Sequence, residues 1–185
     1  MNSIINHILI SMPHMQDPFF GKAVVFMCEH DKQGAMGLIV NKPFRDLELK
    51  EEFDQLYEGS DEILSAVSQV YFGGPVLVER GILLHGEKIH SDNSIKISDD
   101  FFISTHKQTL AEMKIQNGDN QSRLLLGHSG WTSGQLEREI ENGDWLVQET
   151  SPDFIFNVPV EQMWGIAIKS FSIDVSDFSA FGGKA

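Results

Sequence analysis

Two apolar segments separated by four residues constrain the fold of this chain more than any other feature. The segments "KAVVFMCEH" (22–30) and "AMGLIVNKP" (35–43) are rich in apolar and β-branched residues, and "DKQG" (31–34) joins them. Apolar runs joined by a short loop that contains glycine are typical of a β-hairpin. The second strand is expected to end at Pro43 because proline cannot donate a hydrogen bond to a neighbouring strand. The sequence therefore predicts an antiparallel hairpin.

Outside the hairpin, strand-like and helix-like segments follow one another in an irregular order. Further strands are predicted at 4–10, on both sides of a Gly-Gly-Pro turn within 70–86, and at 94–98, 101–105, 123–127, 144–149 and 153–158. Helices are predicted at 47–57, near 63–67, after Thr105, between Thr132 and Gly143, and from Pro159 to Phe171. This order favours one α+β domain over a regular βαβ array. We expect that domain to cover residues 1–172 and residues 173–185 to form a flexible tail.

The charge and cysteine content narrow the classes of function. The chain of 185 residues has a net charge of −13 that is spread over both halves, and no three basic residues are adjacent. Direct binding of DNA or RNA is therefore disfavoured, because it depends on neutralising phosphates with Lys and Arg. Cys28 is the only cysteine, so no intrachain disulfide can form. With no apolar run of about 20 residues and no export signal at the N-terminus, a cytoplasmic location without membrane insertion is expected.

The segment "LLLGHSGWTSGQLEREI" (124–140) resembles the strand, turn and helix that hold a hydrolase nucleophile. That turn has the pattern G-x-S-x-G, whereas here Trp131 takes the position of the second glycine around Ser129. No histidine follows Ser129 in the chain, so the usual order of a catalytic triad is missing. We therefore predict that Ser129 occupies a structural turn. The alternative is a hydrolase that uses His85 or His128 as its base.

The same segment has features of a capped helix start. Thr132 and Gln135 have the spacing of a capping box, in which each side chain bonds the backbone N–H of the other residue. Gly127, Gly130 and Gly134 would allow a neighbouring backbone or a ligand to approach closely. An anion could bind at such a helix start, although the acidic residues of the first turn weaken that site.

Polar residues stand at both ends of the predicted hairpin. Asp17, Asn41 and Lys42 would form the edge of a polar cleft if the hairpin ends converge on "YFGGP" (71–75). Their structural alternative is the formation of turns and strand ends.

Metal and cofactor chemistry is not indicated by the sequence. Cys28 and His30 are expected on one face of their strand, because side chains alternate along a strand. Two such residues do not make a zinc site, which needs three or four ligands. We therefore predict neither a metal nor a cofactor. The three tryptophans are expected in the core.

Three long segments in order resemble the AlgH/YqgE family of bacterial proteins. They are "SMPHMQDPFFGKAVVFMCEHDKQGAMGLIVNKP", "YFGGPVLVERGILLHG" and "LLLGHSGWTSGQLEREIENGDWL", within a resemblance from about residue 4 to 170. It implies one α+β domain in which a strongly twisted, bifurcated mixed sheet forms a pseudo-barrel flanked by helices. It also implies a part in regulating alginate production, often described as transcriptional. The family turn is usually Gly-Tyr-Ala-Gly-Trp, so His128 and Ser129 depart from it.

Our leading hypothesis is a non-enzymatic cytoplasmic regulator or adaptor that binds an unidentified protein or small molecule. Its recognition surface would lie where the signature turn meets the Gly-Gly-Pro loop, and any transcriptional role would be indirect. The candidate binding residues are Asp17, Asn41, Lys42, Gly73, Gly74, His85, Gly127, Ser129, Gly130, Trp131, Gly134, Gln135 and Glu137. The alternative hypothesis remains the hydrolase with a histidine base.

Overall fold

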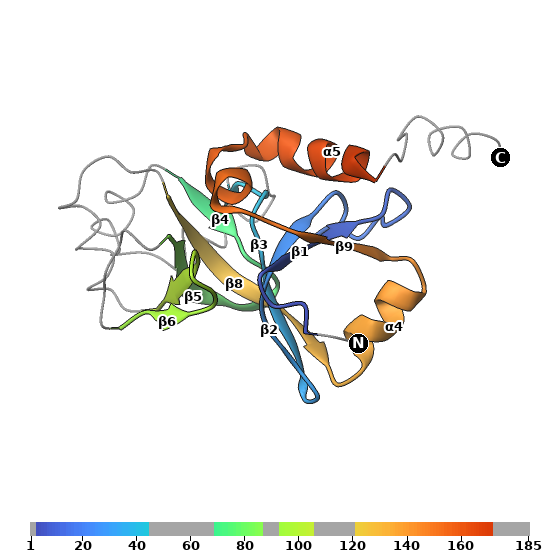
Figure 1. Ribbon diagram of the computed structural model, residues 1–185, viewed down its shortest axis with the longest axis horizontal. Coiled ribbons are helices and arrows are strands. Elements are labelled where there is room, and N and C mark those ends of the chain that lie inside the picture. Colours follow the sequence, from blue (N-terminus) through green and yellow to red (C-terminus); the bar gives the residue numbers. More distant parts are fainter. Residues whose placement is uncertain (1–2, 45–68, 87–92, 106–120, 172–185) are drawn as a thin grey trace.

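One long strand, β8 (Ser122–Thr132), organises the sheet of this protein (Figure 1). The computed structural model describes residues 3–44, 69–86, 93–105 and 121–171. The first half of β8 lies between β4 (Val70–Phe72), which is parallel to it, and β5 (Val76–His85), which is antiparallel. Its second half pairs with β3 (Gly34–Ile39) instead of β4. The sheet therefore divides at β8, where β3 and β4 share one edge.

The predicted hairpin is confirmed. Strand β2 (Val24–Asp31) pairs antiparallel with β3, and its register joins Val25 to Ile39 and Asp31 to Gly34. On its other edge β2 pairs with β1 (His7–Ser11). Beyond β1 the outermost strand is β9 (Trp145–Glu149). This half of the sheet thus brings the N-terminal strands against a strand from near the end of the described chain.

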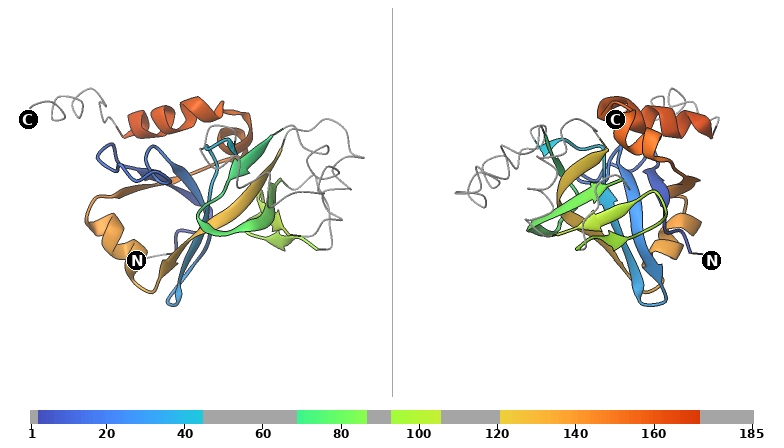
Figure 2. Two further views of the ribbon diagram at one scale, coloured as in Figure 1. Left: turned by 180° about the vertical axis from the view of Figure 1, so that it is seen from behind. Right: turned by 60° about the vertical axis from the view of Figure 1, so that its left-hand side comes forward.

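The other half of the sheet extends from β5. Strand β7 (Phe102–Ser104) pairs with β5, and the short β6 (Ile95–Lys96) forms the edge next to β7. Figure 2 shows that this half turns away from the β1–β3 half, so that the mixed sheet of nine strands curls into a half-barrel. The α+β class and the twisted, divided sheet are confirmed.

Side chains on the two faces of the sheet form separate hydrophobic clusters. Along β2, Val24 and Phe26 belong to the first cluster, whereas Val25 and Met27 belong to the second. Helix α5 (Val160–Ser170) contributes to the first cluster and lies over β1 and β9 (Figure 1). Helix α4 (Gln135–Glu141) contributes to the second, next to the ends of β8 and β9. Because β2 is buried on both faces, it reads as a continuous apolar run.

Two predictions of secondary structure are wrong. The strand predicted at 123–127 continues to Thr132, so the expected turn around Ser129 is strand. Residues 153–158 form no strand: Asp153–Asn157 is a π-helical turn. Its local bonds explain the difference, because the Phe154 N–H donates to Ser151 Oγ and Asn157 Nδ2 donates to Asp153 Oδ1.

Several other predictions fall on residues that are not described. The helices at 47–57 and 63–67, the helix after Thr105, and the tail at 173–185 lie outside the described residues. The helices predicted near Gly143 and after Pro159 are confirmed as α4 and α5. Within the described part of the chain, no helix combines the length and apolar character needed to cross a bilayer.

Candidate functional site

The glycines of the two signature motifs pack backbone against backbone. We name Gly73, Gly74 and Gly127 the glycine crossing, because here the β4–β5 connection passes over β8. A Cβ added at Gly73 would lie 2.3 Å from the Gly127 carbonyl oxygen, and one at Gly74 would lie 2.2 Å from the His128 carbonyl carbon. Real Cβ atoms do not approach backbone that closely. Close packing therefore accounts for these three glycines without a ligand.

Ser129 lies on β8 and is fully buried. It pairs with Gly37 in the β3–β8 ladder, and its Oγ donates to the Gly73 carbonyl oxygen over 3.4 Å. A carbonyl cannot take the hydroxyl proton as a general base, so this contact is structural. The prediction of a turn at this position was wrong, because pairing with β3 holds the segment extended despite its glycines and serine.

The start of α4 is only partly capped as predicted. Gln135 Oε1 accepts bonds from the Thr132 backbone N–H and hydroxyl, both at 3.1 Å, which is the reach-back half of a capping box. The residue that precedes the helix is Gly134, with φ of 71° and no side-chain cap. Glu137 lies in the first turn, and a bond from its own backbone N–H is the main cause of its lowered carboxylate pKa. Because Glu137 lies in the first turn, binding of an anion at this helix start is disfavoured, in line with the weakening expected from the sequence.

Two buried indoles converge on Glu139, a residue that the sequence analysis did not select as a site. Glu139 Oε2 accepts bonds from Trp131 Nε1 and Trp145 Nε1, each at 2.9 Å. Its Oε1 accepts a bond from Gln135 Nε2, also at 2.9 Å. The i, i+4 spacing of Gln135 and Glu139 was the available signal, but the indoles come from two different strands. This network ties α4 to β8 and β9, and it places Trp131 and Trp145 in the core as expected.

Cys28 and His30 do not share a face as predicted. The β2–β3 register shifts between Met27 and Glu29, and this bulge inserts one residue into the alternation. Cys28 packs in the first cluster, where burial raises the pKa of its thiol. The His30 ring instead accepts a bond from the Ile4 N–H at Nδ1, and its Nε2 lies 3.0 Å from Glu137 Oε1. His30 therefore joins the N-terminal segment to α4.

The hairpin ends do converge on the middle motif, but their polar groups are used locally. Lys42 accepts a bond from the Phe72 N–H at its carbonyl, and its Nζ donates to the Gly21 carbonyl at 2.6 Å. Burial lowers the pKa of the Lys42 amine. Asn41 bonds the Val24 N–H and the Lys22 carbonyl, and Asp17 Oδ1 caps the N–H groups of Phe19 and Phe20. These three residues fix the turn and strand ends through these local bonds.

Arg123 is a buried cation that the sequence analysis did not identify. Only 5% of the residue is exposed, and none of the ion pairs among the described residues involves it. Its Nη1 donates to the Val40 carbonyl and contacts Met163 Sδ at 3.6 Å, and its Cζ lies 5.0 Å from the Tyr71 ring centroid. Burial lowers the pKa of the guanidinium. Arg123 thereby joins Val40, just after β3, to β4 and α5 around β8.

The segment after the Gly-Gly turn is exposed and apolar. We name Pro75, Val76 and Leu77 the β5 strip. Val76 is 40% exposed and Leu77 is 41% exposed, and Leu77 has a φ of 52°, which a leucine rarely adopts. Val76 pairs with His128 of β8, and the β5–β8 register shifts between Val76 and Gly81. A Cβ added at Gly130 would meet only Val76 Cγ2, at 3.9 Å, so the exposed Gly130 borders the strip without being crowded.

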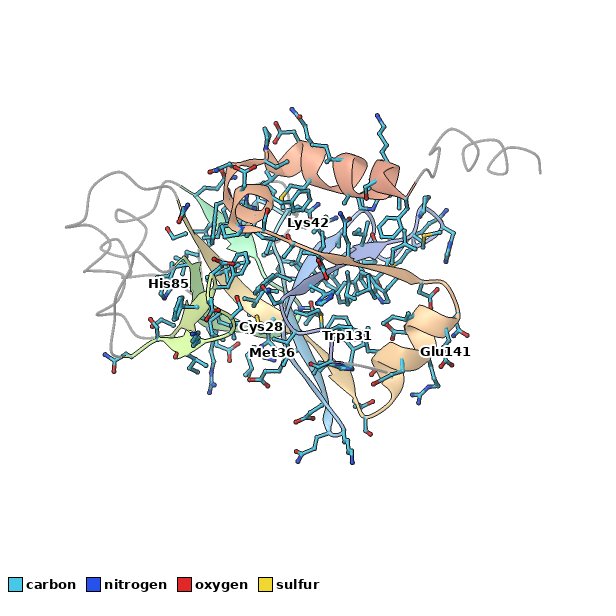
Figure 3. The ribbon with its side chains drawn as sticks, viewed as in Figure 1. Cys28, Met36, Lys42, His85, Trp131 and Glu141 are labelled. Carbon is cyan, nitrogen blue, oxygen red and sulfur yellow. The ribbon has the colours of Figure 1, made fainter. Side chains whose placement is uncertain are left out.

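His85 lies well apart from Trp131, in the half of the sheet that extends from β5 (Figure 3). It is fully buried at the end of β5, and its ring stacks on Phe102 with centroids 5.7 Å apart. Nδ1 lies 2.9 Å from the Gly86 carbonyl oxygen, and Nε2 lies 2.9 Å from Ser94 Oγ. Because a carbonyl only accepts, Nδ1 carries the proton and Nε2 accepts from Ser94. Burial lowers the pKa of His85 and favours this neutral form.

The structure therefore divides the predicted site residues into separate groups. Gly73, Gly74, Gly127 and Ser129 meet at the crossing, Gly130 borders the β5 strip, and His85 is remote from all of them. Gly134, Gln135 and Glu137 belong to the start of α4 and Trp131 to the end of β8, whereas Asp17, Asn41 and Lys42 hold the hairpin ends. Among the residues that the structure describes, no group of three or more His, Cys, Asp or Glu side chains is arranged to hold a metal ion.

Comparison with known proteins places the chain among bacterial relatives. The DUF179 family, described as AlgH-like, matches residues 8–176. UPF0301 protein PSHAa2600 of Pseudoalteromonas translucida is 40% identical over 186 residues, covering 100% of both chains. UPF0301 protein PMI0339 of Proteus mirabilis is 39% identical and covers 99% of this chain and 100% of its own.

Two solved structures share the fold. The solution structure of the AlgH protein from Pseudomonas aeruginosa has a TM-score of 0.72 and 32% identity, covering 100% of this chain and 97% of that one. The crystal structure of DIP2367 from Corynebacterium diphtheriae also has a TM-score of 0.72, at 22% identity, covering 98% of this chain and 94% of that one. The second likeness concerns the fold alone.

Proposed function

The chain belongs to the AlgH-like family, and we propose that it is a regulator or adaptor that acts by binding another protein. The observation that carries this proposal is the β5 strip, where Val76 and Leu77 expose apolar side chains from a strained segment. A positive φ at a leucine costs free energy that the fold must offset, and such strain is concentrated at functional positions. The strip therefore has features of a docking site.

The chemistry of the strip favours a protein partner. Adjacent exposed apolar side chains gain more from contact with another apolar surface than from a polar small molecule. Glu79 and Arg80 are exposed just beyond the strip and would contribute to a polar rim. The net charge of −13 opposes direct contact with nucleic acid, so a regulatory role would operate through a protein. The cytoplasmic location also stays a prediction.

Photo-crosslinking followed by titration tests this function. A photoreactive amino acid at position 77 should crosslink to a partner in cells, whereas the same group at position 166 should not. Ile166 is the matched control because it is an exposed apolar residue, 46% exposed, on α5. The partner that the crosslink identifies is then purified by itself and titrated against this protein.

The titration compares Leu77→Asn with Ile166→Asn. Asparagine tolerates the left-handed conformation, so Leu77→Asn removes the apolar side chain without adding strain. We expect Leu77→Asn to weaken binding about tenfold or more, as for a central interface residue, and Ile166→Asn to leave it unchanged. Equal affinities for both variants would contradict the proposal. A micromolar, salt-sensitive complex with duplex DNA would contradict the proposal and would indicate direct binding of nucleic acid instead.

A further inference from the structure

We propose that Ser94 and His85 form a nucleophile–base pair that cleaves carboxylic esters with good leaving groups. The pair is separate from the β5 strip and does not involve Ser129. It meets two geometric requirements of nucleophilic catalysis, namely a hydroxyl bonded to a base and a base held by a third group. The distances are 2.9 Å from Ser94 Oγ to His85 Nε2 and 2.9 Å from His85 Nδ1 to the Gly86 carbonyl oxygen.

The Gly86 carbonyl takes the place that a carboxylate holds in a Ser-His-Asp triad. It fixes the tautomer, so that Nε2 presents a lone pair to Ser94. A neutral carbonyl stabilises the imidazolium less than a carboxylate does, because it carries no full charge. The pair therefore suits esters with good leaving groups more than amides.

Ser94 is more exposed than its base. Ser94 is half-buried, whereas His85 is fully buried and covered on one face by Phe102. The next residue, Ile95, is 62% exposed on edge strand β6. The sheet edge at Ile95 is therefore exposed next to the pair.

The reaction consumes only ester and water. Ser94 Oγ attacks the ester carbonyl carbon and His85 Nε2 takes the hydroxyl proton, so an O–C bond forms as in other serine nucleophiles. When the tetrahedral species collapses, the bond to the alkoxy group breaks and His85 gives that proton to the departing oxygen. Water then attacks the acyl-serine with His85 again as base, which releases the carboxylic acid and restores Ser94.

Several other nucleophilic side chains differ from Ser94 in their partners. Ser98 donates to Asn6 Oδ1 over 3.3 Å, and Ser129 donates to a carbonyl. Cys28 is buried and its thiol pKa is raised, so it contributes little background reactivity. Ser98 is therefore a matched control, since it lies four residues from Ser94 and its hydroxyl bonds Asn6 instead of a histidine.

Labelling with a fluorophosphonate probe and the burst of p-nitrophenol from p-nitrophenyl acetate test the pair. In the folded protein we expect the label on Ser94 by peptide mapping and a burst of p-nitrophenol. Ser94→Ala should reduce both about 100-fold or more, and Ser98→Ala should change neither. His85→Gln should also abolish both while circular dichroism remains native. Absence of label from Ser94, or equal labelling in His85→Gln, would overturn the proposal.

A second measurement covers the case in which His85→Gln fails to fold. Ser94→Cys and Ser98→Cys keep His85 and are alkylated with iodoacetamide at pH 7. A thiol paired with an imidazole holds more thiolate, so alkylation at position 94 should be about tenfold faster than at position 98. Equal rates would show that His85 does not act on this position and would overturn the proposal.

Discussion

The glycine crossing and the sheet edge at β6 and β7 each contain a serine, but only the serine at the edge is bonded to a histidine. At the crossing, a conspicuous sequence contains Ser129, which is buried and donates to a carbonyl. At the edge, an inconspicuous sequence contains Ser94, which is half-buried and bonded to a histidine. A glycine-rich motif can be required for close packing of the backbone, whereas the reactivity of a hydroxyl depends on the group that lies next to it.

The largest loss of stability is expected when a side chain is added to a glycine of the crossing. Gly74→Ala would place a Cβ 2.2 Å from the His128 carbonyl carbon at a φ of 148°, so backbone must move. We expect the free energy of unfolding to fall by about 4 kcal/mol or more, as in other cases of severe strain. Gly130→Ala is the control, with less than about 0.5 kcal/mol expected. Similar urea midpoints for the two variants would show that the crossing is not closely packed.

A second prediction tests whether side-chain hydrogen bonds also stabilise the region that follows the glycine crossing, at the end of β8 and in α4. Glu139→Ala removes the acceptor for the buried indoles of Trp131 and Trp145. Each unpaired buried donor costs about 1–3 kcal/mol, so we expect a loss of about 3 kcal/mol. Glu141→Ala, at an exposed position of the same helix, should stay near the parent in chemical unfolding (Figure 3). A loss in Glu141→Ala as large as in Glu139→Ala would show that the bonds to the indoles are not the cause of the effect.

The third prediction compares the two serines directly. Ser94→Ala leaves Nε2 of buried His85 without its donor, which should cost about 1–2 kcal/mol. Ser129→Ala should cost about 0.5 kcal/mol, because the Gly73 carbonyl keeps its bond from the Ile39 N–H. Urea denaturation of both variants measures the difference. A larger loss for Ser129→Ala would reverse the contrast between the two regions.

The smallest expected effect is a pH dependence that comes from His85. Burial lowers its pKa below the ordinary 6.5, so the unfolded chain binds the proton first. This contribution to stability is complete above pH 6.5 and is lost as pH falls through the lowered folded-state pKa. His85→Gln should therefore flatten the decline in the free energy of unfolding, measured with urea from pH 7.5 to 5.5, by at most about 1.4 kcal/mol per pH unit. Parallel pH profiles would contradict the assignment.

Local signals were sufficient for elements whose partners are close in sequence or whose pattern is strong. The β2–β3 hairpin, β9 and the two described helices were predicted from apolar spacing, glycine and proline. The same signals failed at Ser129, where a distant strand held the backbone extended, and at Cys28 and His30, where a bulge changed the alternation. The strand predicted at residues 153–158 was wrong because local side-chain hydrogen bonds favoured a helical turn.

The partners of the candidate site residues could not be predicted from sequence spacing, because they depend on which residues lie close together in the fold. The sequence identified His85 as a possible base but paired it with Ser129, because nothing in the residue order indicates that Ser94 folds back onto it. Glu139 and Arg123 were missed for the same reason, since their partners come from strands and helices far apart in the chain.

The sequence by itself determined the α+β class, the hairpin and the family, because these follow from residue order and short-range sterics. Only the tertiary structure decided that Gly73, Gly74 and Gly127 pack against one another and that Ser94 rather than Ser129 bonds a histidine. The physical reason is that hydrogen bonds and steric contacts act over a few ångströms in space. The curled sheet brings such groups together without regard to their separation along the chain.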